Sequence, residues 1–480
     1  MTKTIAMSWV LFVAAGAGCG DDSSVTDVVG EDGAADVEGG ADADADVEAT
    51  GEVETEGGGD AEGGADGDTD GDADGDADAG SACEALPGPT GRVLNVDPST
   101  VGDINGTIAG AGPGDTIEFA DGEYDMSGLY IWVDRPGITL RSASGNRDAV
   151  TLDGHYATTE ILTIAASDVT IADLTIRRPG THAIHVVSTA DGDTVNALIY
   201  NVHVIDPGQQ AIKINPGSDG RYVDDGVVAC SRLELTDEGR PHVDPTAGGC
   251  YTGGIDAHQA RGWVIRDNEI EGFWCDTGLS EHAVHFWRGC RDTIVERNEL
   301  RDNARGVGFG LMTDGEARTY ADDPCPAAGG SYVDHYAGIV RNNFIFAGRA
   351  ELFASPDGFD CGVCLWSACG GRVVHNSIVS TGDNFSSIEW RFATSIGVEI
   401  ANNIATHPLR ERDGASATQA GNLEGASLGL FVGGSVGNLH LDPGAAAAID
   451  QGVTLAAGLC ADDIDGELRD ATPDIGADEL

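Results

Sequence analysis

The sequence predicts an all-β protein whose main body is a single-stranded, right-handed parallel β-helix, or solenoid. Three observations predict it: a five-residue unit that recurs seven times, a second short unit that follows most of its copies, and a change of composition at Cys83. Beyond Cys83, short apolar alternations are separated by Gly, Asn and Asp, and hardly any stretch shows a helical period. Alternation with a period of two is the pattern of β-strands.

The five-residue unit has the form x-small-Ile/Val-x-apolar, so its third and fifth residues lie on one side of a strand. Its central residues are separated by 28, 43, 29, 23, 56 and 25 positions. Gaps of 23 to 29 fit one coil of three strands, and the two long gaps indicate inserted loops or an extra coil. The seven copies are His182–Val186, Gln210–Ile214, Gly253–Ala257, His282–Phe286, Arg305–Phe309, Cys361–Leu365 and Ser386–Trp390.

The second unit has the form Asn-x-apolar, and we interpret its asparagines as a buried ladder at the turns. Each side-chain amide is then expected to bond to the backbone of the next coil. Parallel stacking of the coils gives every strand a neighbour on both sides. The asparagines are Asn268, Asn298, Asn343 and Asn376. The residues expected to share one core are Ile184, Ile212, Ile255 and Val284.

Residues 1–18 have the composition of a signal peptide. Lys3 precedes the apolar run Ile5–Ala17, which is too short to span a bilayer. Gly16-Ala17-Gly18-Cys19 resembles a bacterial lipobox, in which Cys19 carries lipid and becomes the first mature residue. Ala15-Gly16-Ala17 fits an ordinary signal-peptidase site instead. We predict an exported lipoprotein at the outer membrane or cell surface, with simple secretion as the alternative.

Residues 19–82 are predicted to form a disordered acidic tether. Between Asp21 and Gly80 there are 23 acidic residues and no basic one, so this segment has too little apolar surface to offset the entropy of folding. The whole chain carries a formal net charge of -55, which argues against nucleic acid or an anionic membrane surface as a direct partner. We therefore expect membrane attachment only through the lipid anchor, and a monomer.

Cysteine usage agrees with export. The chain has 11 cysteines, and setting Cys19 aside leaves ten, an even number that is typical of disulfides in exported proteins. The pairing cannot be deduced from the sequence. Cys361-x-x-Cys364 also has the spacing of a redox or zinc pair, but no second C-x-x-C supplies two further thiolates. We predict structural disulfides.

Three groups of segments resemble the pectin-lyase-like superfamily. The resemblance covers roughly residues 92 to 480 and implies a β-helix domain over residues 83–480, with a closing segment at about 440–480. The superfamily contains lyases, hydrolases, epimerases and noncatalytic surface proteins, so the resemblance implies a fold and leaves the activity open. The segments are Gly114–Ile117 with Asp121–Tyr124 (entry coil), Val169–Ile171 with Leu174–Ile176 (coil repeats) and Asp463–Glu479 (closing segment).

The fourth residues of the five-residue units form the candidate site. They point away from the core, and stacking places them in one row with about 4.8 Å between neighbours. Lyases of the resembled superfamily carry clefts on such a face, and here insertions near residues 219–249 and 312–336 would wall it. The row is His185, Lys213, Asp256, His285, Gly308, Cys364 and Glu389.

A polysaccharide lyase removes the C5 proton of a uronate after a cation has neutralised its carboxylate. The candidate catalytic residues are Lys213, which is one of two lysines in the chain, His285 and His185. Hydrolysis needs two opposed carboxylic acids, and Asp256 and Glu389 lie too many coils apart for it.

Other side chains near the row are candidates for binding substrate and metal. Arginine binds carboxylates with two parallel hydrogen bonds, and carboxylates are the ligands that Ca²⁺ prefers. The candidates for substrate binding are Arg288, Arg305 and His282. Asp256 is the candidate Ca²⁺ ligand, with Asp276 or Glu281 as its partner.

The leading hypothesis is an exported β-helix that binds a polysaccharide or cell-surface glycan and cleaves it by β-elimination. The rival is a noncatalytic surface scaffold or adhesin, in which the polar row is an ordinary part of the wall. An open groove along the row favours the enzyme, and a row covered by loops favours the scaffold. The negative charge of the chain disfavours a polyanionic substrate, so neutral glycans remain candidate ligands. Aromatic residues that either stack on sugars or pack inside are Trp263, Phe273, Trp274, Phe286, Trp287, Trp366 and Trp390.

Overall fold

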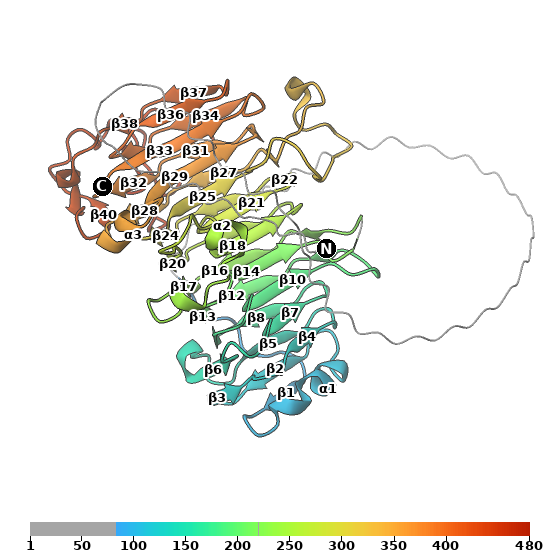
Figure 1. The fold of residues 1–480 in the computed structure, drawn as a ribbon. Coiled ribbons are helices and arrows are strands. Elements are labelled where there is room, and N and C mark those ends of the chain that lie inside the picture. The colour runs from blue at the N-terminus through green and yellow to red at the C-terminus, as the bar shows by residue number, and fades with distance from the viewer. Residues whose placement is uncertain (1–82, 219) are drawn as a thin grey trace, which may run out of the picture. The chain divides into compact units, whose positions relative to one another are not determined.

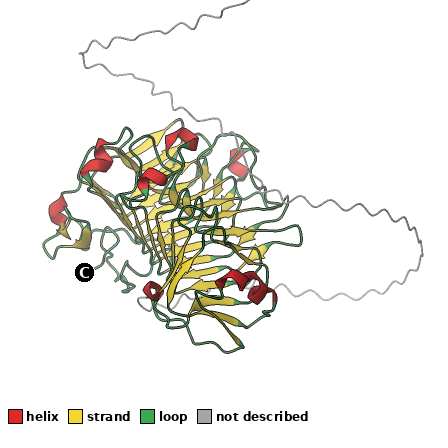
Figure 2. Cartoon of the chain, turned by 60° about the horizontal axis from the view of Figure 1, so that its bottom comes forward, coloured by secondary structure: helices red, strands yellow, loops and turns green. Residues whose placement is uncertain are grey.

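The structure is a computed structural model that describes residues 83–218 and 220–480. The predicted signal peptide, the lipidated Cys19 and the acidic tether lie outside the described residues. The described chain consists mainly of short strands joined by turns and loops (Figure 1; Figure 2). Within it, we find no helix with the length and apolar character that crossing a membrane requires.

Three long parallel sheets form the wall of the fold, and the chain passes through them in the fixed order A, B, C before it starts the next coil. Parallel strands joined by such crossovers wind in a right-handed sense. The structure therefore has the right-handed parallel β-helix that the sequence predicts. The strands of sheet A are β1 (Val93–Val96), β2 (Thr116–Phe119), β5 (Thr139–Ser142), β8 (Thr170–Ala172), β12 (Leu198–Tyr200), β16 (Val227–Ala229), β19 (Val264–Arg266), β23 (Ile294–Glu296), β27 (Ile339–Arg341), β31 (Arg372–Val374), β34 (Val398–Ala401) and β37 (Ala417–Ala420).

Sheets B and C complete each coil. The strands of sheet B are β3 (Gly122–Asp125), β6 (Val150–Asp153), β9 (Thr175–Arg177), β13 (His203–Ile205), β17 (Arg232–Glu234), β20 (Glu269–Glu271), β24 (Glu299–Arg301), β28 (Phe344–Ala347), β32 (Ser377–Ser380), β35 (Ile404–Ala405) and β38 (Leu423–Glu424). The strands of sheet C are β4 (Ile131–Val133), β7 (Leu162–Ile164), β10 (Ile184–Val187), β14 (Gln210–Asn215), β18 (Gly253–His258), β21 (Val284–Trp287), β25 (Arg305–Phe309), β29 (Phe359–Trp366), β33 (Asn384–Arg391) and β36 (Leu409–Arg412).

The other strands and the helices are short and lie outside the three long sheets. The remaining strands are the parallel pair β11 (Thr194–Val195) and β15 (Val223–Asp224), the parallel trio β22 (Cys290–Arg291), β26 (His335–Tyr336) and β30 (Ala368–Cys369), and the antiparallel pair β39 (Phe431–Gly433) and β40 (Asn438–Leu441). The helices are α1 (Ile104–Ala109), α2 (Thr246–Gly249) and α3 (Ala350–Ala354), with 3-10 turns at Val101–Asp103, Arg147–Ala149, Arg240–His242, Pro326–Ala328 and Leu428–Leu430.

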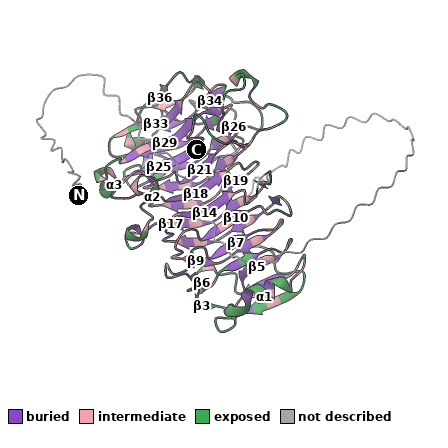
Figure 3. Ribbon diagram, turned by 45° about the vertical axis from the view of Figure 1, so that its right-hand side comes forward, coloured by how far each residue is buried: buried purple, intermediate pink, exposed green. Residues whose placement is uncertain are grey.

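The core lies inside the three sheets and is built from the inward residues of successive coils. Ile184 pairs with Ile212, Ile212 with Ile255, and Ile255 with Val284, and all four side chains are fully buried. The same register continues through Val307, Val363 and Ile388. The predicted core row is therefore confirmed, and the buried strands of sheet C stand out in Figure 3.

A ladder of asparagine amides joins the coils at the turn between sheets A and B. Asn268 Nδ2 donates to Asn298 Oδ1 at 2.9 Å, Asn298 Nδ2 to Asn343 Oδ1 at 2.9 Å, and Asn343 Nδ2 to Asn376 Oδ1 at 2.9 Å. Each oxygen also accepts the backbone N–H of the preceding asparagine, as Asn298 Oδ1 does from Asn268 at 3.0 Å. The ladder thus satisfies polar groups that would otherwise be buried without partners. It runs two rungs beyond the predicted set, to Asn403 and Asn422.

The C-terminal segment packs on one flank of the solenoid. Ile475 and Ala477 share an apolar cluster with Phe344 of β28 and Val379 of β32. The Ala477 N–H donates to Ser377 Oγ at 3.1 Å. The last residues therefore cover strands of sheet B.

Eight cysteines of the described residues form disulfides, as the sequence predicts, whereas Cys290 and Cys460 remain as thiols. Cys290 is fully buried, and its Sγ lies 3.0 Å from the Trp287 carbonyl oxygen. The bonded pairs are Cys83–Cys230, Cys250–Cys275, Cys325–Cys369 and Cys361–Cys364.

Replacing Asn343 by alanine tests the asparagine ladder. The change removes the acceptor of the Asn298 backbone N–H and a donor to the Val295 carbonyl in a buried turn, so we expect the free energy of unfolding to fall by about 2–4 kcal/mol. Urea unfolding followed by circular dichroism measures it. The matched control is Asn438→Ala, at an exposed position, which should cost less than about 0.5 kcal/mol. Equal losses in the two variants would contradict a stabilising ladder.

Candidate functional site

The outward residues of sheet C stand in one row, in the register that the sequence predicts. His185 pairs with Lys213, Lys213 with Asp256, and Asp256 with His285. The row continues through Gly308 and Cys364 to Glu389. At its N-terminal end it extends through Thr163 to Trp132, and at its C-terminal end it extends to Arg410.

The middle of the row is buried although it lies outside the core. Lys213 is 6% exposed, Asp256 1% and His285 0%, and Cys364 and Glu389 are similarly covered. His185 is partly exposed. The described residues therefore form no open groove over the proposed catalytic lysine and histidine.

The inserted loop at residues 312–336 is tied back to neighbouring coils by the buried Asp334. Asp334 is fully buried, and its carboxylate accepts the N–H groups of Leu311 and Met312 at 2.6 and 2.7 Å and that of Arg288 at 2.7 Å. Leu311 packs on the apolar cluster that contains Cys361 and Cys364. The loop that we expected to wall a cleft is thus anchored on the coils beside the row by Asp334.

Lys213 and Asp256 form a buried ion pair, in which the ammonium donates a hydrogen bond to Asp256 Oδ2. Lys213 Nζ also lies 3.1 Å from His258 Nε2, and the indole N–H of Trp287 donates to Asp256 Oδ1 at 2.8 Å. Burial lowers the pKa of Lys213, but Asp256 outweighs it and holds the pKa above its ordinary value. Burial likewise raises the pKa of Asp256, and Lys213 and His258 outweigh it and hold the pKa well below its ordinary value.

A second pair of opposite charges lies beside the first. His285 Nδ1 is 2.9 Å from Glu281 Oε2 and 3.6 Å from Asp256 Oδ1. Burial alone would lower the pKa of His285, and the Glu281 carboxylate reverses the effect, so the pKa is raised. The imidazolium of His285 and the ammonium of Lys213 thus face the carboxylates of Glu281 and Asp256.

This charge balance limits what the centre of the row can do chemically. A base that abstracts a proton must be unprotonated and must reach its substrate. The Asp256 carboxylate holds the pKa of Lys213 above its ordinary value, the Glu281 carboxylate raises that of His285, and both side chains are covered, so in this conformation they serve as partners of buried carboxylates. The catalytic roles given to them from the sequence remain predictions.

The predicted ligands of substrate are engaged within the fold. Arg305 Nε donates to Asp360 Oδ2 at 2.8 Å, and its guanidinium lies 5.0 Å from the centre of the Trp366 ring. The Arg288 guanidinium lies 4.7 Å from the centre of the Trp287 ring, and His282 is fully buried. The seven aromatic residues named in the sequence analysis are at most 6% exposed, so packing is their role in this structure.

The donors around Asp256 do not fit a Ca²⁺ ion, which takes six to eight oxygen ligands. One oxygen of Asp256 accepts from Trp287 and the other from Lys213. Asp276 is exposed, and Glu281 contacts His285. A hollow of about 460 Å³ lies elsewhere, over sheet B, where Arg177, Ile205 and Asp206 line it.

The N-terminal end of the row is accessible, and it includes residues that sequence reasoning missed. Trp132 is 39% exposed and neighbouring Tyr130 is 56% exposed. His185 Nδ1 lies 2.9 Å from Glu160 Oε1, and His185 Nε2 lies 2.5 Å from Asn215 Oδ1. The available signal was a tryptophan between Ile131 and Val133, whose inward alternation points Trp132 out of the core.

Comparisons with known proteins find similar structures but no similar sequence. No model of a known protein family matches the sequence, and no curated protein matches it. The structure is similar to that of the pectate lyase Pel9A, with a TM-score of 0.49 and 14% identity over 84% of this chain and 98% of that one.

Two further similar structures carry different descriptions. An alginate lyase from Paenibacillus sp. str. FPU-7 has a TM-score of 0.37 and 13% identity, over 70% of this chain and 98% of that one. PfbA, a surface adhesin of Streptococcus pneumoniae, has a TM-score of 0.38 and 12% identity, over 72% of this chain and 90% of that one. All three TM-scores are below 0.5, so these likenesses give no argument for an activity.

Buried neutral histidines predict that acid destabilises the fold. Burial lowers the pKa of His258 to about 4 and that of His182, His335 and His375 to about 3 each. Below pH 6.5 these histidines bind protons in the unfolded chain but stay unprotonated in the folded one. The free energy of unfolding therefore falls as the pH falls. His285, with a raised pKa, has the opposite sign. Each of the four contributes up to about 1.4 kcal/mol per pH unit between its folded and unfolded pKa values.

Urea unfolding at pH 7 and pH 5 measures this dependence, and we expect a loss of several kcal/mol at pH 5. His335→Gln should reduce the number of protons taken up on unfolding by about one, because glutamine does not titrate. The slope of the unfolding free energy against pH falls accordingly. Equal stability at the two pH values would show that these histidines are not held neutral by burial.

Proposed function

We propose that this protein is an exported β-helix that binds a neutral polysaccharide at the exposed end of its polar row and does not cleave it by β-elimination. Export is supported by the signal-like residues 1–18 and by the four disulfides. The observation that carries the binding site is the contrast in exposure along one face of sheet C. Trp132 is 39% exposed, whereas Lys213 and Asp256 are 6% and 1% exposed.

The exposed end has the composition of a sugar-binding surface. An aromatic face provides apolar contact area, and the polar groups beside it provide hydrogen bonds that fix orientation. Here Trp132 and Tyr130 supply the aromatic area, and Glu160, His185 and Asn215 supply the polar groups about two rungs away. We call these five residues the aromatic platform.

The platform stands on a well-supported edge. Asn105 of α1 holds the start of β4, because its Oδ1 accepts the Trp132 N–H at 2.9 Å and its Nδ2 donates to the Tyr130 carbonyl at 2.9 Å. Fixing the backbone on both sides of Ile131 lowers the entropy lost when a ligand stacks on the ring. The platform is thus ordered before a ligand arrives.

Charge selects the class of glycan. The chain carries a formal net charge of -55, which repels polyuronates and sulfated chains at long range. The pair of Glu160 and His185 is suited to hydroxyl groups, since a carboxylate accepts hydrogen bonds and an imidazole can donate or accept them. A neutral polysaccharide meets no such repulsion.

Replacing Trp132 by alanine tests the platform. Binding of the full chain to a panel of immobilised neutral and acidic polysaccharides is measured by affinity electrophoresis. Loss of one stacking ring should weaken binding to the neutral ligand by about 1–2 kcal/mol, or roughly tenfold. The control is Phe385→Ala, an aromatic residue of β33 that is 42% exposed at the other end of sheet C. Equal weakening by both changes, or binding to acidic polysaccharides alone, would refute the proposal.

The lyase alternative has its own test. Absorbance of unsaturated uronate products is followed during incubation with pectate, alginate and glycosaminoglycans, with and without Ca²⁺. We expect no product, because Lys213 and His285 are covered and lie against buried carboxylates. Product formation that Lys213→Met abolishes would establish the lyase and reject the noncatalytic reading.

A further inference from the structure

The polar row has a gap at Gly308, and a histidine from the neighbouring coil fills it. Gly308 lies between His285 and Cys364 in the register of sheet C. A Cβ atom on Gly308 would come within 2.6 Å of three atoms of the His282 ring. The imidazole of His282 therefore lies against the backbone of β25, in space that any other residue at position 308 would occupy.

His282 is buried without a hydrogen-bond partner. It is fully shielded from solvent, and neither Nδ1 nor Nε2 has a hydrogen-bond partner among the described residues. An unsatisfied buried polar group costs about 1–3 kcal/mol, so its presence calls for an explanation. Burial, His285 and Arg305 all lower the pKa of His282, so the ring is neutral and keeps a free lone pair.

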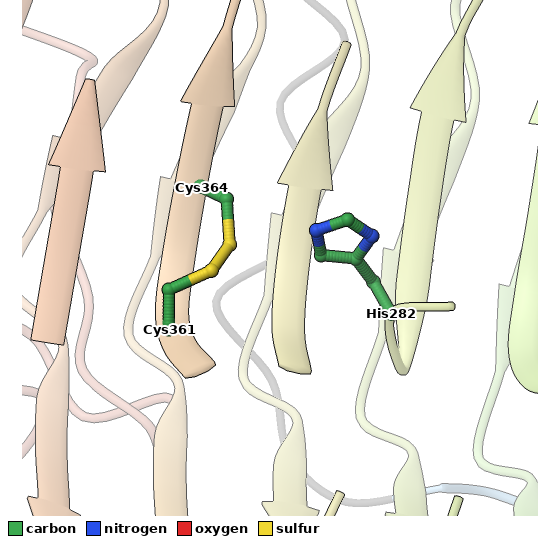
Figure 4. A group of neighbouring side chains, drawn as sticks. All are labelled: His282, Cys361 and Cys364. Atoms are coloured by element: carbon green, nitrogen blue, oxygen red, sulfur yellow. A yellow bond between two sulfur atoms is a disulfide. The ribbon is translucent and has the colours of Figure 1, made fainter. Parts of the chain in front are cut away.

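The open side of this imidazole faces Cys361 and Cys364 of β29, as Figure 4 shows. One ligand atom from each of the three residues lies within 4.8 Å of the other two. Gly362 lies between the two cysteines, where a Cβ would come within 2.5 Å of an Ile378 methyl carbon, and the two cysteine Cα atoms are 6.0 Å apart. Both cysteines are buried and joined by a disulfide.

We propose that reduction of the Cys361–Cys364 disulfide creates a site for one Zn²⁺ ion, bound by the two thiolates and a ring nitrogen of His282. A water-soluble phosphine supplies the two electrons. It becomes the phosphine oxide by taking the oxygen of a water molecule, and the two hydrogens of that water go to the sulfurs. Binding of Zn²⁺ to the two thiols then releases two protons.

The donor set and the charge both favour zinc. Two cysteines at C-x-x-C spacing together with a histidine are a usual tetrahedral zinc set, in which the fourth position is taken by another side chain or by water. Two thiolates neutralise the charge of Zn²⁺, so the occupied site buries no net charge.

The site is separate from the aromatic platform, which is built on earlier coils. The sequence has no second C-x-x-C to supply further zinc ligands. The third ligand is instead His282, from the coil of β21. Leu311 and Phe392 cover the cysteines, which keeps bulk water from the sulfurs.

Zinc uptake by the whole reduced protein tests the proposal. The full chain is reduced with the phosphine under argon, mixed with Zn²⁺ and desalted, and bound zinc is measured by mass spectrometry. X-ray absorption at the zinc edge should show two sulfur atoms at about 2.3 Å and at least one nitrogen at about 2.0 Å. This measurement needs no variant, so it does not depend on a mutant that folds. No bound zinc, or a zinc shell without two sulfur atoms, would overturn the proposal.

Variants of the proposed ligands test which residues bind the zinc. Cys361→Ser with Cys364→Ser should abolish the zinc that carries two sulfur atoms, whereas the control pair Cys325→Ser with Cys369→Ser, which removes another disulfide, should leave it unchanged. His282→Phe keeps a ring in the space above Gly308 and should weaken zinc binding by at least about tenfold. Unchanged zinc affinity in His282→Phe would show that the imidazole is not a ligand.

Discussion

The stacking of each coil on the next in exact register is the constraint on which the rest of the structure depends. Main-chain hydrogen bonds between parallel strands fix the register, and they carry every side chain of one coil to a defined neighbour on the next. A slip of one residue would send the inward isoleucines to the outside. The register therefore places Lys213 opposite Asp256 although 43 positions separate them in the sequence. It also keeps the asparagine amides within bonding distance of one another.

Burial then decides what the polar row does. Charges that leave water must find partners: within the row Lys213 faces Asp256, and beside it His285 faces Glu281. His282 differs from these neighbouring side chains, because both of its ring nitrogens lack a hydrogen-bond partner. The exposed end, around Trp132, has ring surface open to a ligand. One face of one sheet thus divides into a structural part and an accessible part.

The features set by short-range alternation could be predicted from the sequence. The inward Ile212 and the amide ladder at Asn298 follow from a period of two and a repeated turn, and the structure has both. The path of the insertion at residues 312–336 depends on contacts such as that of Asp334 with Leu311, which no local pattern encodes. Trp132 was overlooked because it lies outside the seven repeated units. The place of the His282 ring depends on the missing side chain of Gly308 in the next coil, so it needed coordinates.

A double-mutant cycle between Lys213 and Asp256 tests most directly whether register brings distant residues together in a closed, buried row. The free energy of unfolding is measured for Lys213→Met, for Asp256→Asn and for the double variant. Each single change leaves a buried group unpaired, so a loss of about 3–5 kcal/mol is expected. The double variant should lose less than the sum of the two, by at least about 1 kcal/mol. Additive losses, within about 0.5 kcal/mol, would contradict the account, because they would mean that the two side chains do not meet.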